Sequence, residues 1–264
     1  MDDHCSVFPK QTESFTVHLS HTQFDIAPYL RRYQAGEWRA PIFHDAILQD
    51  IATIPHPPKL LDIGCGQGFD TLLHLQTSLS THATGGYIGI EPDKSIPLAP
   101  IFSEVYHCCF EDAPIQPESI DIAFAYMVLE HIQEPELFWN KIYEVLHQGG
   151  IFWAFTMDAR HYFTKASMLF EYLGLKDAYL DFLHGKNGEN RYENYPTQYL
   201  SNSPKQIQQL TKHRFSHTDV WTFGRIGQLD YYYPRGTKWI SHMIDRISLS
   251  IGMAGSVLVI RAVK

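Results

Sequence analysis

The alternation of apolar and helical segments between Lys59 and Thr156 restricts the fold of this chain more than any other feature. Short apolar segments that have the character of buried strands lie at residues 59–63, 87–90, 105–110, 120–126 and 151–156. Helical patterns separate most of them, at residues 70–78, 97–103 and 135–146, and Gly149-Gly150 follows the last as a helix stop. Such alternation is typical of parallel βαβ units.

The regular alternation ends after Asp158. A helical segment rich in Leu, Phe and Tyr covers residues 165–183, and a second helix is expected at 204–212. Two closing strands, 220–223 and 257–263, flank a helix at 238–249, and the N-terminal part is helical at 41–51. We therefore predict an α/β fold with a Rossmann-like, mostly parallel sheet of seven strands, flanking helices and a helical cap insertion.

We expect a single domain over residues 1–264. Its parts are an N-terminal helical arm (1–55), a core (56–157), the helical insertion (158–217) and a closing segment of strands and a helix (218–264). With 44% hydrophobic and 19% charged residues, the chain has enough apolar side chains for a sizeable core.

The charge and the cysteine content indicate which partners are excluded and in which compartment the protein is expected. The net charge is −8, and Arg31-Arg32 is the longest basic run, so we expect no nucleic-acid partner. The most apolar window, residues 249–260, is too short for a transmembrane segment, and the N-terminus lacks the pattern of a secretory signal. Four cysteines without a CxxC pair favour a reduced, cytoplasmic protein.

A glycine-rich turn follows the first strand, in LLDIGCGQGFDT (residues 60–71). Gly64, Gly66 and Gly68 suit a tight turn that a ligand approaches closely, at the strand end where α/β sheets bind ligands. The spacing is GxGxG and no Lys-Ser/Thr pair follows, which excludes a P-loop and disfavours a nicotinamide dehydrogenase. The turn favours a ligand with an amino acid moiety.

LLDIGCGQG resembles motif I of the class I S-adenosylmethionine-dependent methyltransferases. Further landmarks follow in the order of that family: Glu91 after YIGI, FEDAP at 110–114, SIDIAFAYMVLEHI at 119–132 and EVLHQGGIFW at 144–153. The resemblance covers residues 59–157 and, more loosely, the last two strands. It implies that the core binds S-adenosylmethionine, with S-adenosylhomocysteine as product, and that the insertion forms a substrate cap.

The resemblance also implies the cofactor-binding residues. Asp62 would orient the turn and the cofactor's ammonium, although it could instead cap the helix, and Glu91 would accept both ribose hydroxyls unless it is a solvated loop carboxylate. Cys109 stands where the family often has Asp, so Glu111 or Asp112 is expected to hold the adenine amino group. The full expected set is Asp62, Gly64, Cys65, Gly66, Gly68, Glu91, Pro92, Phe110, Glu111, Asp112 and Tyr126.

Catalytic candidates are His131, Tyr162 and Tyr199. His131 follows the fourth strand and is either a general base or a structural residue of its loop, and each tyrosine is either a pocket residue or a packing residue. His213 and His217 are spaced as metal ligands can be, but no third ligand accompanies them, so we expect no metal.

Methyl transfer from a sulfonium depends mostly on proximity and alignment, and a base is needed only where the acceptor must lose a proton. We therefore favour O-methylation of a small-molecule, natural-product-like acceptor. The alternatives are a peptide, protein or lipid-linked acceptor, and a non-catalytic module that only binds S-adenosylmethionine. The sequence does not assign an oligomeric state.

Overall fold

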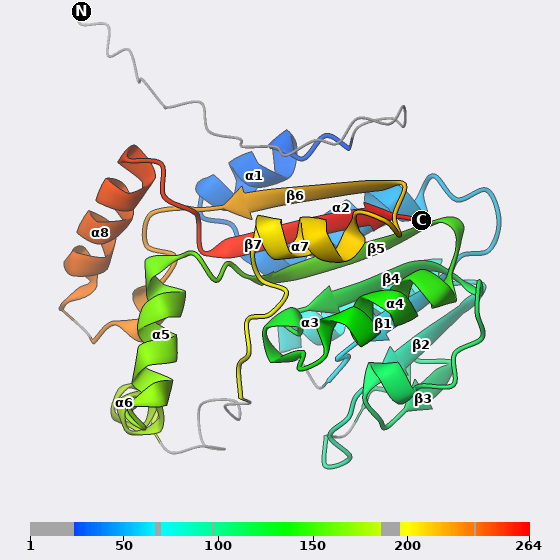
Figure 1. The fold of residues 1–264 in the computed structure, drawn as a ribbon, viewed down its shortest axis with the longest axis horizontal. Helices are drawn as coiled ribbons and strands as arrows, with labels where there is room; N and C mark the ends of the chain where they lie inside the picture. Colours follow the sequence, from blue (N-terminus) through cyan, green and yellow to red (C-terminus); the bar gives the residue numbers. More distant parts are fainter. Residues whose placement is uncertain (1–23, 67–69, 97, 186–195, 235) are drawn as a thin grey trace, which may run out of the picture.

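A computed structural model describes residues 24–66, 70–96, 98–185, 196–234 and 236–264. Its centre is a seven-stranded sheet in the order β3-β2-β1-β4-β5-β7-β6 (Figure 1). β7 is antiparallel to both neighbours, and the other pairs are parallel. The strands are β1 (Lys59–Ile63), β2 (Gly86–Ile90), β3 (Glu104–Tyr106), β4 (Ile120–Tyr126), β5 (Leu146–Met157), β6 (His217–Phe223) and β7 (Val257–Val263). The predicted Rossmann-like, mostly parallel sheet is confirmed.

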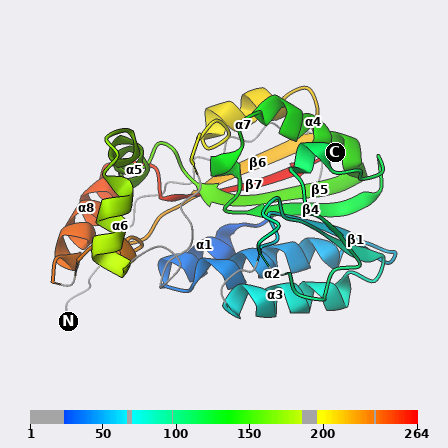
Figure 2. The same ribbon diagram turned by 90° about the horizontal axis from the view of Figure 1, so that it is seen from below.

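Helices cover both faces of the sheet (Figure 2). One face carries α1 (Ala27–Gln34), α2 (Arg39–Ile51) and α3 (Asp70–His82), and the other carries α4 (Pro135–Val145) and α7 (Pro204–Thr211). Each layer encloses its own hydrophobic core, because the buried strands present apolar side chains to both faces. Trp139 of α4 lies in the core between the sheet and α4 and α7. Trp153 of β5 lies in the core between the sheet and α1 and α2.

Three helices form a cap beyond the carboxyl ends of β5 and β6, namely α5 (Tyr162–Tyr172), α6 (Lys176–His184) and α8 (Lys238–Ser250). The insertion expected at 158–217 therefore differs from the cap in two elements. α7 lies within the expected insertion but packs on the sheet and is not part of the cap, because Ile207 and Leu210 are buried in the core shared with α4 and β6. α8 lies in the closing segment of the sequence but belongs to the cap. Its Asp245 accepts a hydrogen bond from Tyr162 of α5 over 2.7 Å.

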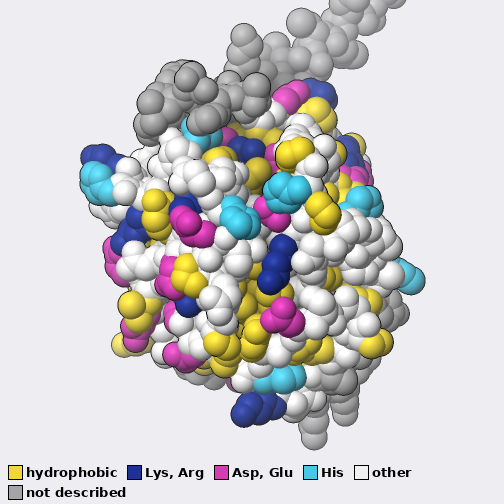
Figure 3. Space-filling model, turned by 90° about the vertical axis from the view of Figure 1, so that its right-hand side faces the viewer, with side chains coloured by type: hydrophobic (Ala, Val, Ile, Leu, Met, Phe, Trp, Pro, Cys, Tyr) yellow, Lys and Arg dark blue, Asp and Glu magenta, His cyan; other side chains and the backbone are white. Residues whose placement is uncertain are grey.

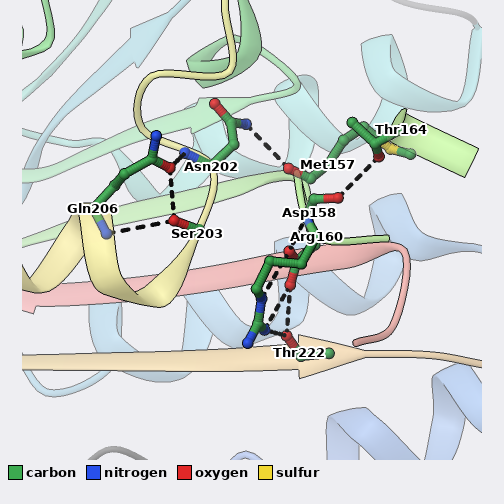
Figure 4. Close-up of polar contacts among 8 residues, drawn as sticks. All are labelled: Met157, Asp158, Arg160, Thr164, Asn202, Ser203, Gln206 and Thr222. Atoms are coloured by element: carbon green, nitrogen blue, oxygen red, sulfur yellow. Dashed lines mark hydrogen bonds and ion pairs between the residues drawn. The ribbon is translucent and has the colours of Figure 1, made fainter. Parts of the chain in front are cut away.

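Buried polar contacts attach the cap to the end of β5 (Figure 4). The fully buried Asp158 carboxylate accepts from Arg160 Nη2 over 2.8 Å and from Thr222 Oγ1 of β6 over 2.9 Å. Thr164 Oγ1 in α5 donates to the Asp158 carbonyl over 2.9 Å. Asn202 Nδ2, just before α7, donates to the Met157 carbonyl over 3.1 Å. The residues after β5 thus tie the cap, β6 and the entry to α7 together.

Several expected elements differ in the structure. No helix forms at residues 98–103, where Pro100 interrupts backbone hydrogen bonding, and the third strand shortens from 105–110 to β3 (Glu104–Tyr106). The helical segment 165–183 is two helices, α5 and α6, and Gly174 between them has φ +67°. The Gly149-Gly150 pair lies inside β5 instead of ending α4, and α1 was not expected.

The edge of the molecule opposite the cap carries mixed charges. Figure 3 shows Lys/Arg, Asp/Glu and His side chains interspersed over this face, without an extended area of one sign. Among the described residues, no helix combines the length and the apolar character needed to cross a membrane.

Candidate functional site

The turn after β1 requires glycine at its first position. Gly64 has φ +72°, and a Cβ there would lie 2.4 Å from Val128 Cγ2. The amides of Gly64 and Cys65 donate to the Ile90 carbonyl at the end of β2, over 2.8 and 3.0 Å. These two hydrogen bonds fix the turn against the neighbouring strand. Gly68, the third glycine of the motif, lies outside the described residues.

Glu91 connects the turn to the end of β2. Its Oε2 accepts from the Gly66 N–H over 3.0 Å, and its Oε1 accepts from the Asp93 N–H over 3.0 Å. The side chain is buried, yet each carboxylate oxygen keeps a second lone pair for a ligand hydroxyl. A Cβ on Gly66 would lie 3.0 Å from Oε2, so glycine preserves the space beside this carboxylate.

Asp62 at the end of β1 is a buried carboxylate that two side chains hold. Gln76 Nε2 donates to Asp62 Oδ2 over 2.9 Å, and the Tyr87 hydroxyl donates to the same oxygen over 3.0 Å. Burial raises the pKa of Asp62 to about 7, although both hydrogen bonds lower it. Gln76 also donates to the Cys65 carbonyl over 2.8 Å, so it couples Asp62 to the turn. A ligand ammonium near Asp62 would favour its ionised form.

The expected adenine-side residues lie around a 3₁₀ helix, Phe110–Asp112. Phe110 is buried against Phe138, with ring centroids 5.3 Å apart. Glu111 is partly buried, and burial raises its pKa, whereas Pro92 is exposed. Which of Glu111 and Asp112 contacts an adenine stays a prediction.

Tyr126, the last residue of β4, adjoins the turn from the other side, because β4 pairs with β1 up to Ala125 and Ile63. Its ring stacks on Phe155 at 5.4 Å between centroids, and its hydroxyl accepts from Arg39 Nε over 2.9 Å. Arg39 stands at the first position of α2, about 90 residues earlier in the chain, and the sequence alone did not identify it.

The three catalytic candidates do not form one cluster. Tyr162 in the cap donates its hydroxyl hydrogen to Asp245. His131 Nδ1 lies 2.9 Å from the Pro196 carbonyl oxygen, and Tyr199 is buried beside it, since its N–H donates to the Glu130 carbonyl over 3.2 Å. Burial raises the phenol pKa of both tyrosines. His131 and Tyr199 therefore share a neighbourhood, and Tyr162 belongs to the contact between α5 and α8.

The cap exposes many of its apolar side chains. The exposed large apolar residues of α5, α6 and the link between them are Met168, Leu169, Phe170, Tyr172, Leu173, Leu175 and Phe182. Within the described ranges, no three His, Cys, Asp or Glu side chains form a group that could hold a metal ion. His217 Nε2 instead lies 2.9 Å from Asp219 Oδ1.

This strand order with the reversed β7 is the predicted Rossmann-like fold, and solved S-adenosylmethionine-dependent methyltransferases share it. Residues 61–154 match a family model described as "Methyltransferase domain". The resemblance drawn from the sequence is therefore confirmed. No curated protein sequence matches this chain.

Solved structures share the fold at low sequence identity. A SAM-dependent methyltransferase from Archaeoglobus fulgidus aligns with TM-score 0.52 and 11% identity over 91% of this chain and 100% of that one. A putative methyltransferase of Haloferax volcanii, in complex with the Trm112 activator, has TM-score 0.52 and 14% identity over 90% and 95%. A phosphoethanolamine N-methyltransferase of Haemonchus contortus, with S-adenosyl-L-methionine bound, has TM-score 0.51 and 15% identity over 91% and 57%.

Proposed function

We propose that this protein transfers a methyl group from S-adenosylmethionine to an oxygen atom of a small-molecule acceptor. The observation that carries the proposal is the 3.0 Å contact between the Gly66 N–H and Glu91 Oε2. It places the glycine turn and the acidic residue together at the carboxyl ends of β1 and β2, where ligands bind to open parallel sheets.

The residues around the turn fit the chemical groups of S-adenosylmethionine. Gly66 leaves space beside the Glu91 carboxylate, and Asp62 supplies a buried carboxylate for an ammonium group. Glu91 has acceptor capacity for two ribose hydroxyls. When bound, S-adenosylmethionine supplies a methyl group on a positively charged sulfur.

On this proposal the cap and the loop after β4 position the acceptor oxygen and exclude water. His131 is the proposed base for a hydroxyl acceptor. A carbonyl oxygen only accepts hydrogen bonds, so the contact with Pro196 puts the proton of a neutral His131 ring on Nδ1. Tyr199 beside it, and Tyr162 in the cap, are the proposed tyrosines of the acceptor pocket.

Methyl transfer to a panel of small hydroxy and carboxylic acids, and to short peptides, tests the proposal. Incubation with 13C-methyl-labelled S-adenosylmethionine marks products by mass, and the 13C NMR shift of the new methyl group identifies the atom that carries it. We expect O-methyl products from small acceptors, formed more slowly by a Glu91→Ala variant at limiting S-adenosylmethionine. Methyl groups on nitrogen or carbon, or on peptides alone, would overturn the acceptor assignment.

A further inference from the structure

Arg39 carries a charge that no carboxylate neutralises among the described residues. Its Nε donates to the Tyr126 hydroxyl over 2.9 Å, and this is its sole hydrogen bond to the described part of the chain. The guanidinium lies 5.0 Å from the Trp38 ring centroid and 6.0 Å from that of Tyr126. The two terminal nitrogens therefore keep their N–H groups for another partner.

Each other partly or fully buried arginine in the described ranges either forms an ion pair with a carboxylate or donates hydrogen bonds to backbone carbonyls. Arg225 donates to two backbone carbonyls, those of Tyr33 and Glu37. Those paired with carboxylates are Arg32, Arg160, Arg214 and Arg261. Arg39 is partly buried, and a partly buried charge gains from an oppositely charged partner, so the exception at Arg39 points to a ligand.

The surroundings of Arg39 are aromatic. Burial lowers the pKa of Arg39, but Tyr126, Tyr232 and Tyr33 raise it, and the net pKa is raised. Arg39 therefore remains a cation at every physiological pH. Tyrosine hydroxyls around a guanidinium add neutral hydrogen-bond donors and acceptors without neutralising its charge.

Arg39 lies next to the candidate site, at the carboxyl end of β4. Arg39 begins α2, and its bond to Tyr126 places it at the carboxyl end of β4. The preceding residue of β4, Ala125, pairs with Ile63, which directly precedes Gly64 of the turn. A ligand that occupies the turn and extends toward the cap would pass this end of β4.

We infer that the Arg39 guanidinium binds a carboxylate of a ligand at the carboxyl end of β4. A guanidinium presents a planar fork of N–H groups that matches the two oxygens of a carboxylate. The inference rests on the proposed function, which offers two sources of that carboxylate. One is the amino acid end of S-adenosylmethionine, and the other is an acidic methyl acceptor.

The first experiment compares S-adenosylhomocysteine with 5′-methylthioadenosine, which lacks the amino acid end, by isothermal titration. Both ligands are titrated into the parent protein and into Arg39→Gln, Arg39→Lys and Arg31→Gln. If the cofactor supplies the carboxylate, Arg39→Gln loses about 10- to 100-fold in affinity for S-adenosylhomocysteine and none for 5′-methylthioadenosine. Arg39→Lys loses less because it keeps the charge. Arg31→Gln removes an exposed charge from the same arm and leaves both affinities unchanged.

The second experiment compares aromatic and aliphatic carboxylic acids with their primary amides, each titrated into the complex with S-adenosylhomocysteine. If the acceptor supplies the carboxylate, at least one acid binds 10-fold or more tightly than its amide, and Arg39→Gln abolishes that preference. A purely structural role of Arg39 would weaken acid and amide equally.

The inference is overturned if Arg39→Gln leaves the affinity for S-adenosylhomocysteine and every acid-to-amide ratio at parental values. It is also overturned if Arg39→Gln weakens S-adenosylhomocysteine and 5′-methylthioadenosine to the same extent, with no change in any acid-to-amide ratio. Failure of the parent protein to bind S-adenosylhomocysteine would instead count against the proposed function, so the two failures are distinguishable.

Discussion

The Gly66 N–H and the Glu91 carboxylate meet over 3.0 Å and join the turn after β1 to the end of β2. The carboxylate accepts a second backbone N–H, from Asp93, so its orientation is set from both sides. A carboxylate held this way is prepared to bind without reorganising.

Replacing Glu91 with Ala should weaken S-adenosylhomocysteine binding by about 10- to 150-fold, or roughly 1.5–3 kcal/mol, because it removes a charge-assisted acceptor for the ribose hydroxyls. Isothermal titration measures the effect. Glu104→Ala is the matched control, since Glu104 is an exposed carboxylate on neighbouring β3. Parental affinity in a folded Glu91→Ala variant would remove Glu91 from the site.

Replacing Gly66 with Val should abolish cofactor binding and leave the fold intact. The new Cβ would lie 3.0 Å from Glu91 Oε2, and its methyl groups would fill the space that glycine keeps beside the carboxylate. Circular dichroism and thermal unfolding report the fold, and titration with S-adenosylhomocysteine reports the site. A folded variant with unchanged affinity would contradict the position assigned to the ligand.

Affinity for S-adenosylhomocysteine should fall as pH falls below about 7, the value to which burial raises the pKa of Asp62. The ligand ammonium binds the ionised carboxylate, so at lower pH a proton must first leave, at a cost approaching 10-fold in affinity per pH unit. Titrations between pH 8 and pH 5.5 measure this slope. Asp62→Asn should bind more weakly at pH 8 and show a flatter profile, and a parent profile without any slope in this range would refute the role of Asp62.

Asp50→Ala should lower the free energy of unfolding by about 3–5 kcal/mol, because it leaves the buried Arg261 without its carboxylate. Asp50 accepts from Arg261 Nε over 2.8 Å and from Trp153 Nε1 over 2.8 Å, which ties α2 to β5 and β7. Asp45→Ala on the same helix breaks a half-exposed pair with Arg32 and should cost about 1 kcal/mol or less. Urea unfolding measures both, and equal losses would contradict the assignment.

The sheet could be predicted from the sequence because its central strands are buried on both faces. KLLDI and IDIAFAY are short, mostly apolar runs, and each forms the strand that the pattern predicts. The cap could not be predicted in the same way. α7 and α8 are both short amphipathic segments, and only packing decides that α7 covers the sheet while α8 pairs with α5.

In the candidate site, too, some residues could be expected from the sequence and others only from the structure. Gly64 and Gly66 could be expected because a tight turn and a close ligand approach favour glycine, whereas the resemblance to the family implied Glu91. Gln76, Tyr87 and Arg39 had no such signal. Each acts through a side chain that reaches across from another element, to Asp62 or Tyr126, and such contacts depend on tertiary structure alone.

Titration of S-adenosylhomocysteine into the parent protein at pH 8 tests whether the chain binds the cofactor, since the product binds the same site as the methyl donor and needs no acceptor. We expect saturable binding to one site per chain, weakened in both the Glu91→Ala and the Asp62→Asn variants. A folded protein that gives no saturable binding at millimolar ligand would contradict the assignment of this chain as an S-adenosylmethionine-dependent methyltransferase.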